Sequence, residues 1–177
     1  MRNMLKKLNN KIGSSLVETL ATVVLLGLMG IALVTGVATI QNTYKKIVRK
    51  ANEQTILSTT LIEMRNEIRK SVDYDAGRFQ SRDGYWFSFR EAGTGEKGIY
   101  IDYYMTKDAT TPIQKRPVVS EANGDVSKVY SSFGDGGGVK KESDGLFVIE
   151  KLQVGEAGST NVTKIDSYYV SQITRRK

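Results

Sequence analysis

The chain contains no cysteine and no histidine among its 177 residues. Without cysteine there can be no disulfide and no thiolate metal site, and cysteine usage gives no clue to the compartment. Without histidine, the commonest general base and metal ligand is missing. The sequence also lacks a phosphate-binding glycine loop with lysine, a nucleophile elbow and a cluster of metal ligands. We therefore expect a protein that is not an enzyme and that holds no metal and no cofactor.

Charge is missing from one long stretch, Leu20–Ile40, which covers 21 residues. At about 1.5 Å per helical residue, this run can cross a hydrocarbon core about 30 Å thick. A buried helix of a soluble protein rarely needs a run of this length that is apolar on every side. The stretch therefore predicts a helix that enters a membrane.

Positive charge is concentrated before that stretch. The formal net charge of the chain is +7, and residues 1–13 hold Arg2, Lys6, Lys7 and Lys11 with no acidic residue. The remaining residues 14–177 carry only +3, which is weak support for nucleic-acid binding. Much of the basicity is therefore a membrane-targeting feature.

Two interpretations of the N-terminal region treat it as a simple targeting or anchoring device. In the first, a secretory signal peptide is cut after Ala38, within the small-x-small sequence Gly36-Val37-Ala38, and releases a soluble binding domain. Its apolar core would be longer than usual, and Glu18 would be unexplained. In the second, the helix is the anchor of a single-pass adhesin or receptor domain. Lys45, Lys46, Arg49 and Lys50 beyond the apolar run balance the basic leader, so charge does not fix its orientation.

A third interpretation rests on the order of residues around Glu18. The basic leader ends in Gly13, Ser14 follows, Glu18 comes four residues later, and the apolar run then begins. This arrangement resembles the prepilin signal of type IV pilins and of the pseudopilins of type II secretion and competence systems. The string SSLVETL matches the family pattern at Leu16, Val17 and Glu18, whereas the family usually has phenylalanine at the position of Ser14.

The resemblance implies processing and assembly. A prepilin peptidase would cut between Gly13 and Ser14, the new N-terminus at Ser14 would be methylated, and Glu18 would become the fifth residue of the mature chain. The free amine of Ser14 would then be a partner for Glu18, within one helix or between adjacent subunits. A carboxylate at mid-helix in a membrane costs about 2.5–3.5 kcal/mol on insertion scales, so a role for Glu18 is expected.

The resemblance also implies partners and a location. The partners would be the prepilin peptidase, other pilin or pseudopilin subunits, the inner-membrane platform of the assembly machine, and membrane lipid before assembly. Nucleic acid would be a partner only in a competence pilus. The protein would sit in the cytoplasmic membrane as a single-pass subunit with its head outside, and later in a cell-surface or periplasmic filament.

Small residues interrupt the apolar run at Gly27, Gly30 and Gly36, and Ala32 with Gly36 forms a small-xxx-small pair. Such residues let neighbouring helix backbones approach closely in a membrane or a filament core. Glycine is also simply tolerated in transmembrane helices. Both interpretations remain open.

The helix is expected to continue beyond the apolar run. Residues 41–70 contain neither Pro nor Gly, and apolar residues recur with helical spacing. The downstream stripe is Leu57, Leu61, Met64 and Ile68, and the upstream stripe is Tyr44, Val48 and Ala51. Basic residues 45, 46, 49 and 50 are interpreted as a solvated helix face. We expect one helix from about Ser14 to Lys70, with a protruding apolar first half and an amphipathic second half packed on a sheet.

After Ser71 the sequence favours strands. Candidates are residues 85–90, 99–107, 117–120, 129–133, 146–154 and 162–173. We therefore predict an α+β, pilin-like fold divided into a leader (1–13), a filament-core helix (14–40), an amphipathic helix (41–72) and an antiparallel β-sheet head (73–177). The aromatic residues of the first two strands are expected to pack in the core more readily than to stack on a glycan or a nucleic acid. Residues 134–145 are expected to form a solvated, flexible loop, in preference to a calcium site.

Overall fold

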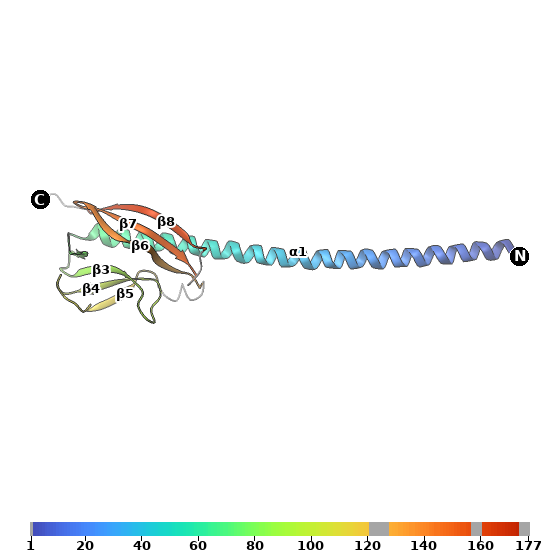
Figure 1. Ribbon diagram of the computed structural model, residues 1–177, viewed down its shortest axis with the longest axis horizontal. Helices are drawn as coiled ribbons and strands as arrows, with labels where there is room; N and C mark the ends of the chain where they lie inside the picture. Colours follow the sequence, from blue (N-terminus) through green and yellow to red (C-terminus); the bar gives the residue numbers. More distant parts are fainter. Residues whose placement is uncertain (1, 121–127, 157–160, 174–177) are drawn as a thin grey trace. The chain divides into compact units, whose positions relative to one another are not determined.

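The computed structural model describes residues 2–120, 128–156 and 161–173, with side chains from residue 16 onward. In this part of the chain, one helix is followed by eight strands (Figure 1). The elements are α1 (Arg2–Lys70), β1 (Asp73–Asp75), β2 (Arg78–Gln80), β3 (Trp86–Glu91), β4 (Ile99–Tyr104), β5 (Gln114–Pro117), β6 (Tyr130–Ser143), β7 (Leu146–Gly155) and β8 (Thr163–Ser171). The predicted class, a long helix packed on antiparallel β-structure, is confirmed.

The helix α1 begins at Arg2, earlier than the expected start near Ser14. Nothing in the leader breaks a helix before Gly13, and a single glycine costs only about 1 kcal/mol relative to alanine. The helix ends at Lys70, as predicted. Both the backbone N–H and the hydroxyl of Ser71 donate to the carbonyl of Ile68, which closes the last turn.

The chain divides into two compact units, Met1–Ile47 and Val48–Lys177. The first unit is the N-terminal part of α1. The second unit, called the head below, contains the last part of α1 and all the strands.

The strands of the head form two antiparallel sheets, where the sequence suggested a single one. Five strands make a sheet in the order β1-β2-β3-β4-β5, and three make a second sheet in the order β6-β7-β8. The sequence indicated β3, β4, β7 and β8 within a few residues. It missed β1 and β2, which have three residues each, and it placed β5 too late, because β5 ends at Pro117.

Residues 134–143 belong to strand β6, so the prediction of a flexible loop there was wrong. Phe133 pairs with Leu152 and Gly138 with Glu150, which leaves residues 134–137 as an insertion in the ladder. A Cβ on Gly137 would lie 2.8 Å from the carbonyl oxygens of Glu150 and Gly134. The glycines therefore let β6 bulge and continue, because the bulge brings two backbones too close for a side chain.

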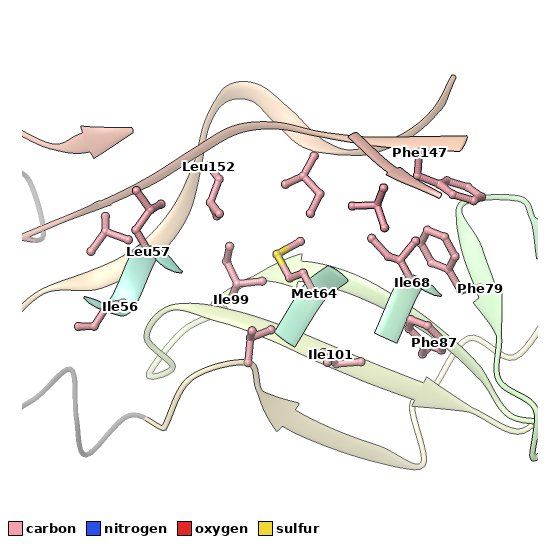
Figure 2. Packing of buried hydrophobic residues seen from close by; sticks show 14 of the residues in the cluster. Ile56, Leu57, Met64, Ile68, Phe79, Phe87, Ile99, Ile101, Phe147 and Leu152 are labelled. Carbon is pink, nitrogen blue, oxygen red and sulfur yellow. The ribbon is translucent and has the colours of Figure 1, made fainter. Parts of the chain in front are cut away.

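The core of the head is formed by the helix and both sheets. Ile56, Leu57, Met64 and Ile68 of α1 belong to a buried cluster that also includes residues of β2, β3, β4 and β7. Figure 2 shows Met64 and Ile68 among side chains of both sheets, including Phe79, Phe87, Ile101 and Phe147. Three residues of the predicted downstream stripe are buried and Leu61 is half-buried. The upstream stripe is not part of this core, because Tyr44, Val48 and Ala51 are exposed.

The aromatic residues of β3 and β4 pack inside the head, as predicted. Phe87 and Phe89 contact Phe79, with ring centroids 5.3 and 6.1 Å from its ring. On the other face, Trp86, Tyr100 and Tyr104 are also buried, and the Arg78 guanidinium stacks 3.8 Å above the Tyr104 ring. These rings are therefore not arranged as an open stacking platform. Only Tyr85, which precedes β3, is exposed.

Candidate processing and assembly helix

The predicted cleavage position, Gly13 and Ser14, lies inside α1. The structure describes only the helical backbone of these two residues. The basic leader and the apolar run therefore belong to one continuous helix, with no loop between them. A peptidase acting between Gly13 and Ser14 would have to open this helix locally, and a glycine lowers the cost of doing so.

Glu18 lies one turn beyond Ser14, so the two residues share a face of α1. Its side chain is exposed, in a segment where every described side chain from residue 16 to Ile47 is exposed. The next acidic residue along α1 is Glu53, in the head. Glu18 is thus the one carboxylate of the described apolar segment.

The threonine side chains of this segment donate hydrogen bonds to carbonyls of the helix itself. The hydroxyl of Thr22 donates to the carbonyl of Glu18 at 2.7 Å, and Thr35, Thr39 and Thr43 donate to the carbonyls of Ile31, Thr35 and Thr39 at 2.9 Å. A threonine bonded in this way exposes its methyl group and keeps its hydroxyl hydrogen away from the surroundings. These residues therefore fit an apolar environment, whereas the carboxylate of Glu18 does not.

The small residues of the apolar run fall on two faces of the helix. Gly36 is 18 residues from Glu18, which is five whole turns at about 3.6 residues per turn, and Ala32 lies one turn before Gly36. Gly27 is nine residues from Glu18, so it lies on the opposite side, with Gly30 one turn away. A Cβ added to Gly27, Gly30 or Gly36 would meet nothing within 4 Å. The space beside these glycines is therefore open to another molecule.

The same helix is long and apolar enough to cross a membrane. Its most apolar 18-residue window has a mean hydropathy of 2.4, and none of that window is buried. In a folded soluble protein, a helix that is apolar all round is normally covered by other parts of the structure. This segment exposes large side chains all along its length, including Leu20, Leu25, Leu26, Ile31 and Leu33.

The sequence suggested that the basic residues after the apolar segment form a solvated helix face. The structure differs at Arg49, whose side chain is half-buried. Arg49 donates from Nε to Glu53 Oε1 at 3.0 Å, and its Nη1 lies 3.2 Å from Glu156 Oε2. Glu53 is buried and its second oxygen accepts from the Thr163 hydroxyl at 2.8 Å. Arg49 thus ties α1 to the end of β7 within the head. Periodicity of apolar residues cannot reveal such a contact between distant parts of the sequence.

A second ionic cluster lies at the end of β3 and was also missed. Arg90 donates to both carboxylate oxygens of Glu96 and, from Nε, to Asp102 Oδ2 at 2.6 Å. These bonds raise the pKa of Arg90. The Arg90 guanidinium, with the backbone N–H of Gly93, lowers the pKa of Glu96 from 4.5 to about 2. The cluster fixes the loop between β3 and β4. Glu96 lies in the loop between β3 and β4 and Asp102 lies on β4, so no sequence motif marks these partners of Arg90.

Among the residues that the structure describes, no group of three or more Asp or Glu residues could hold a metal ion. The acids considered for calcium at residues 135, 142 and 144 lie along β6 and the turn after it. Asp144 is paired with Lys141 at 2.7 Å.

No protein-family model, no curated protein and no solved structure matches this chain.

Proposed function

We propose that this protein is a minor pilin or pseudopilin subunit, cut by a prepilin peptidase between Gly13 and Ser14. It assembles through α1 into a filament of the type IV pilus, type II secretion or competence kind. The observation that carries the proposal is the position of Glu18. It is the one carboxylate in the exposed apolar segment of α1 that the structure describes, and it lies five residues after the glycine that ends the basic leader.

The cost of placing Glu18 in an apolar environment supports a specific partner. A charged carboxylate in hydrocarbon is unfavourable unless it is paired or hydrogen-bonded. Cleavage after Gly13 creates a cationic amine on Ser14, one turn away on the same face. Glu18 pairs with this amine, of its own chain or of the adjacent subunit. The intrahelical bonds of the threonines leave Glu18 as the polar group that still requires such a partner.

The leader and the helix have separate roles in this proposal. The leader lies on the cytoplasmic side, where a prepilin peptidase of the kind that the resemblance implies would cut it, so the chain begins as a single-pass membrane protein with its head outside. Removing the leader lets the helix leave the bilayer and enter a filament core, where the faces with Gly27 and Gly30 and with Ala32 and Gly36 allow close helix contacts. The partners are the peptidase, the platform of the assembly machine and other subunits.

The test compares Glu18→Ala with Glu63→Ala, a matched substitution on the part of α1 that lies in the head. In the native host, we expect both variants to be cut after Gly13. Glu18→Ala should be lost from sheared filaments, and Glu63→Ala should be present at the wild-type level. Immunoblots of the membrane and filament fractions measure both steps. Glu18→Ala in filaments at the wild-type level would show that the charge pairing is wrong.

A third variant separates processing from assembly. Gly13→Leu places a bulky side chain at the bond to be cut, so the chain should stay at its full length in the membrane fraction and be absent from filaments. Normal cleavage of Gly13→Leu would place the processing site elsewhere.

A further inference from the structure

A pocket of about 360 Å³ opens in the head where the two sheets meet. Its lining comes from the end of β3, the loop between β3 and β4, the start of β6 and the end of β7. Glu91 of β3 joins the sheets here, because its Oε1 accepts a hydrogen bond from the backbone N–H of Phe133 on β6. The volume lies at the lower end of the range for small-molecule sites, so the pocket suits a small ligand or one side chain of a larger one.

The lining of the pocket is more acidic than basic. Its charged residues are three glutamates and one lysine, namely Glu91, Glu96, Glu156 and Lys97. The lysine is held by Tyr130, because its Nζ donates to the Tyr130 hydroxyl at 3.1 Å and lies 5.1 Å from the centroid of the ring. An anionic ligand is therefore disfavoured in this pocket, and a cationic ligand is favoured.

Two of the glutamates are partly neutralised by arginines. Arg90 binds Glu96 and Arg49 binds Glu156, with N–O distances of 2.5 and 3.2 Å. Each arginine is shared with a second carboxylate, that of Asp102 for Arg90 and that of Glu53 for Arg49.

Glu91 differs from these two glutamates. Its printed partner is the uncharged N–H of Phe133, and among the residues that the structure describes no basic side chain forms an ion pair with it. The side chain is also exposed. Glu91 is therefore the carboxylate of the lining that offers its charge to a ligand.

Ser131 adds a buried hydroxyl to the same pocket. This residue is 4% exposed, and no group in the described part of the chain forms a hydrogen bond with its Oγ. Gly98 lies beside it, and a Cβ on this glycine would be 3.6 Å from Ser131 Oγ. The missing side chain leaves the space next to the hydroxyl open. A buried hydroxyl without a partner is unfavourable, so a ligand that donates a hydrogen bond to it gains free energy.

The carboxylate and the hydroxyl lie beside the same part of β6. Glu91 contacts Phe133, and Gly98 lies against Ser131, two residues earlier, which is about 7 Å along a strand. Since Oε1 of Glu91 already accepts a hydrogen bond, the carboxylate does not offer both oxygens freely to a planar guanidinium. An ammonium group carries its charge on one atom and donates three separate hydrogen bonds, so it suits two separate acceptors.

We propose that this pocket binds a primary ammonium group on an alkyl chain. The ammonium donates to the Glu91 carboxylate and to the Ser131 hydroxyl, and the alkyl chain lies against Ala92 and Val162 of the lining. Such a group is present in free alkylamines and in the lysine side chains of proteins. A metal ion does not fit the pocket, because no group of three acidic residues in the described ranges could hold one. The site goes beyond the proposed function and does not depend on assembly through α1.

The test uses the full-length protein in a non-ionic detergent at pH 7, titrated with n-pentylamine hydrochloride at constant ionic strength. The shifts of the Gly98 and Ser131 amide signals in nitrogen–proton NMR spectra give the dissociation constant and locate the ligand. We expect saturable shifts with pentylamine and at least about tenfold weaker binding of 1-pentanol, which lacks the charge. Binding of 1-pentanol as tight as that of the amine, or no saturable shift with the amine, would overturn the proposal.

Substitutions test the two acceptors. Glu91→Gln keeps an oxygen for the Phe133 N–H but removes the charge, and it should weaken pentylamine binding at least about tenfold. Ser131→Ala removes no hydrogen bond within the described chain, so it should keep the fold and also weaken binding. The control is Glu142→Gln, which makes the same change of charge at an exposed residue outside the lining and should leave the dissociation constant unchanged. Wild-type affinity in Glu91→Gln or in Ser131→Ala would contradict the assigned contacts.

A second ligand distinguishes the two sources of the ammonium group. Nα-acetyl-lysine N-methylamide presents the group as it occurs in a protein, and pentylamine presents it as a free amine. Tighter binding of the lysine derivative assigns the site to a lysine side chain of a partner protein, and tighter binding of pentylamine assigns it to a soluble alkylamine. Either result supports recognition of the ammonium group, provided that Glu91→Gln weakens both ligands.

Discussion

The N-terminal part of α1 and the head differ in whether their apolar side chains are buried within the chain. In the head, apolar side chains of the helix and of two sheets bury one another, and residues such as Met64, Ile68 and Phe147 have no exposed surface. From residue 16 to Ile47, every side chain is exposed and the polar groups of the threonines are satisfied locally. The head can therefore be stable on its own, whereas the apolar segment requires an environment supplied by lipid or by other chains.

This contrast shows where function and stability are encoded. In the head, contacts within the chain explain why most of the residues described above are apolar or glycine. In the apolar segment, contacts within the chain do not explain the glycines, since these face open space. Substitutions in the two regions should accordingly have separable effects, one on unfolding of the head and the other on assembly.

The largest effect on stability is expected from the core of the head. Phe79 is 2% exposed, and its ring centroid lies 4.8 Å from those of Tyr74 and Phe147 and 5.3 Å from that of Phe87. Phe79→Ala should lower the free energy of unfolding by about 3–5 kcal/mol, because it removes buried area and leaves a cavity. Denaturant unfolding of the full chain in detergent, followed by fluorescence of the single Trp86, measures this loss.

The matched substitution in the other region is Leu25→Ala, at a side chain that is 59% exposed. It should change the unfolding free energy of the head by less than about 0.5 kcal/mol. A loss comparable to that of Phe79→Ala would show that the apolar segment also stabilises the head, and the division between the two regions would fail.

Glycine substitutions compare the two regions with one chemical change. Gly137→Ala in β6 should destabilise the head by about 1–3 kcal/mol, because the added Cβ would lie 2.8 Å from two backbone oxygens. Gly36→Ala meets no atom of the chain and should instead favour the helix by about 0.5–1 kcal/mol. Thermal unfolding and helical content by circular dichroism in detergent provide the two measurements.

Measuring the incorporation of Gly36→Ala into filaments distinguishes a packing role of Gly36 from simple tolerance of glycine. Gly36→Ala should reduce incorporation if a neighbouring helix uses the open space, although the isolated chain becomes more helical. Unchanged incorporation would show that Gly36 is merely tolerated, which was the alternative open from the sequence.

The smallest effect concerns acid stability of the head. The pKa of Glu96 is lowered to about 2 in the folded protein from 4.5, mainly by the hydrogen bonds from Arg90. A group whose pKa is lower when folded contributes stability that is complete above about pH 4.5 and is lost as the pH falls towards 2. Glu96→Gln should therefore flatten the dependence of the denaturation midpoint on pH in this window. An unchanged slope would assign the acid sensitivity to other carboxylates.

The sequence predicted those parts of the fold that depend on local periodicity. The helix to Lys70 and the buried stripe of Leu57, Met64 and Ile68 follow from helical spacing, and β7 follows from its apolar content. It did not predict the division into two sheets, because which strands pair depends on contacts between distant residues. It also mistook the glycines of β6 for a loop, because glycine in a bulged strand and glycine in a loop are alike in composition.

The candidate site could be proposed from the sequence because its evidence is local: Gly13, Ser14 and Glu18 lie within six residues. The ionic contacts of Arg49 with Glu156 and of Arg90 with Asp102 were not predictable in this way. They join residues up to about a hundred positions apart, as Arg49 and Glu156 show.

The most direct test of the account is the mass of the native N-terminal peptide, measured on protein isolated from the membrane and filament fractions of its host. We predict that the mature chain begins at Ser14, with or without a methyl group on its amine. A chain beginning at Thr39 would contradict the account and indicate a secreted domain, and an intact Met1 in every fraction would contradict it in favour of a permanent membrane anchor.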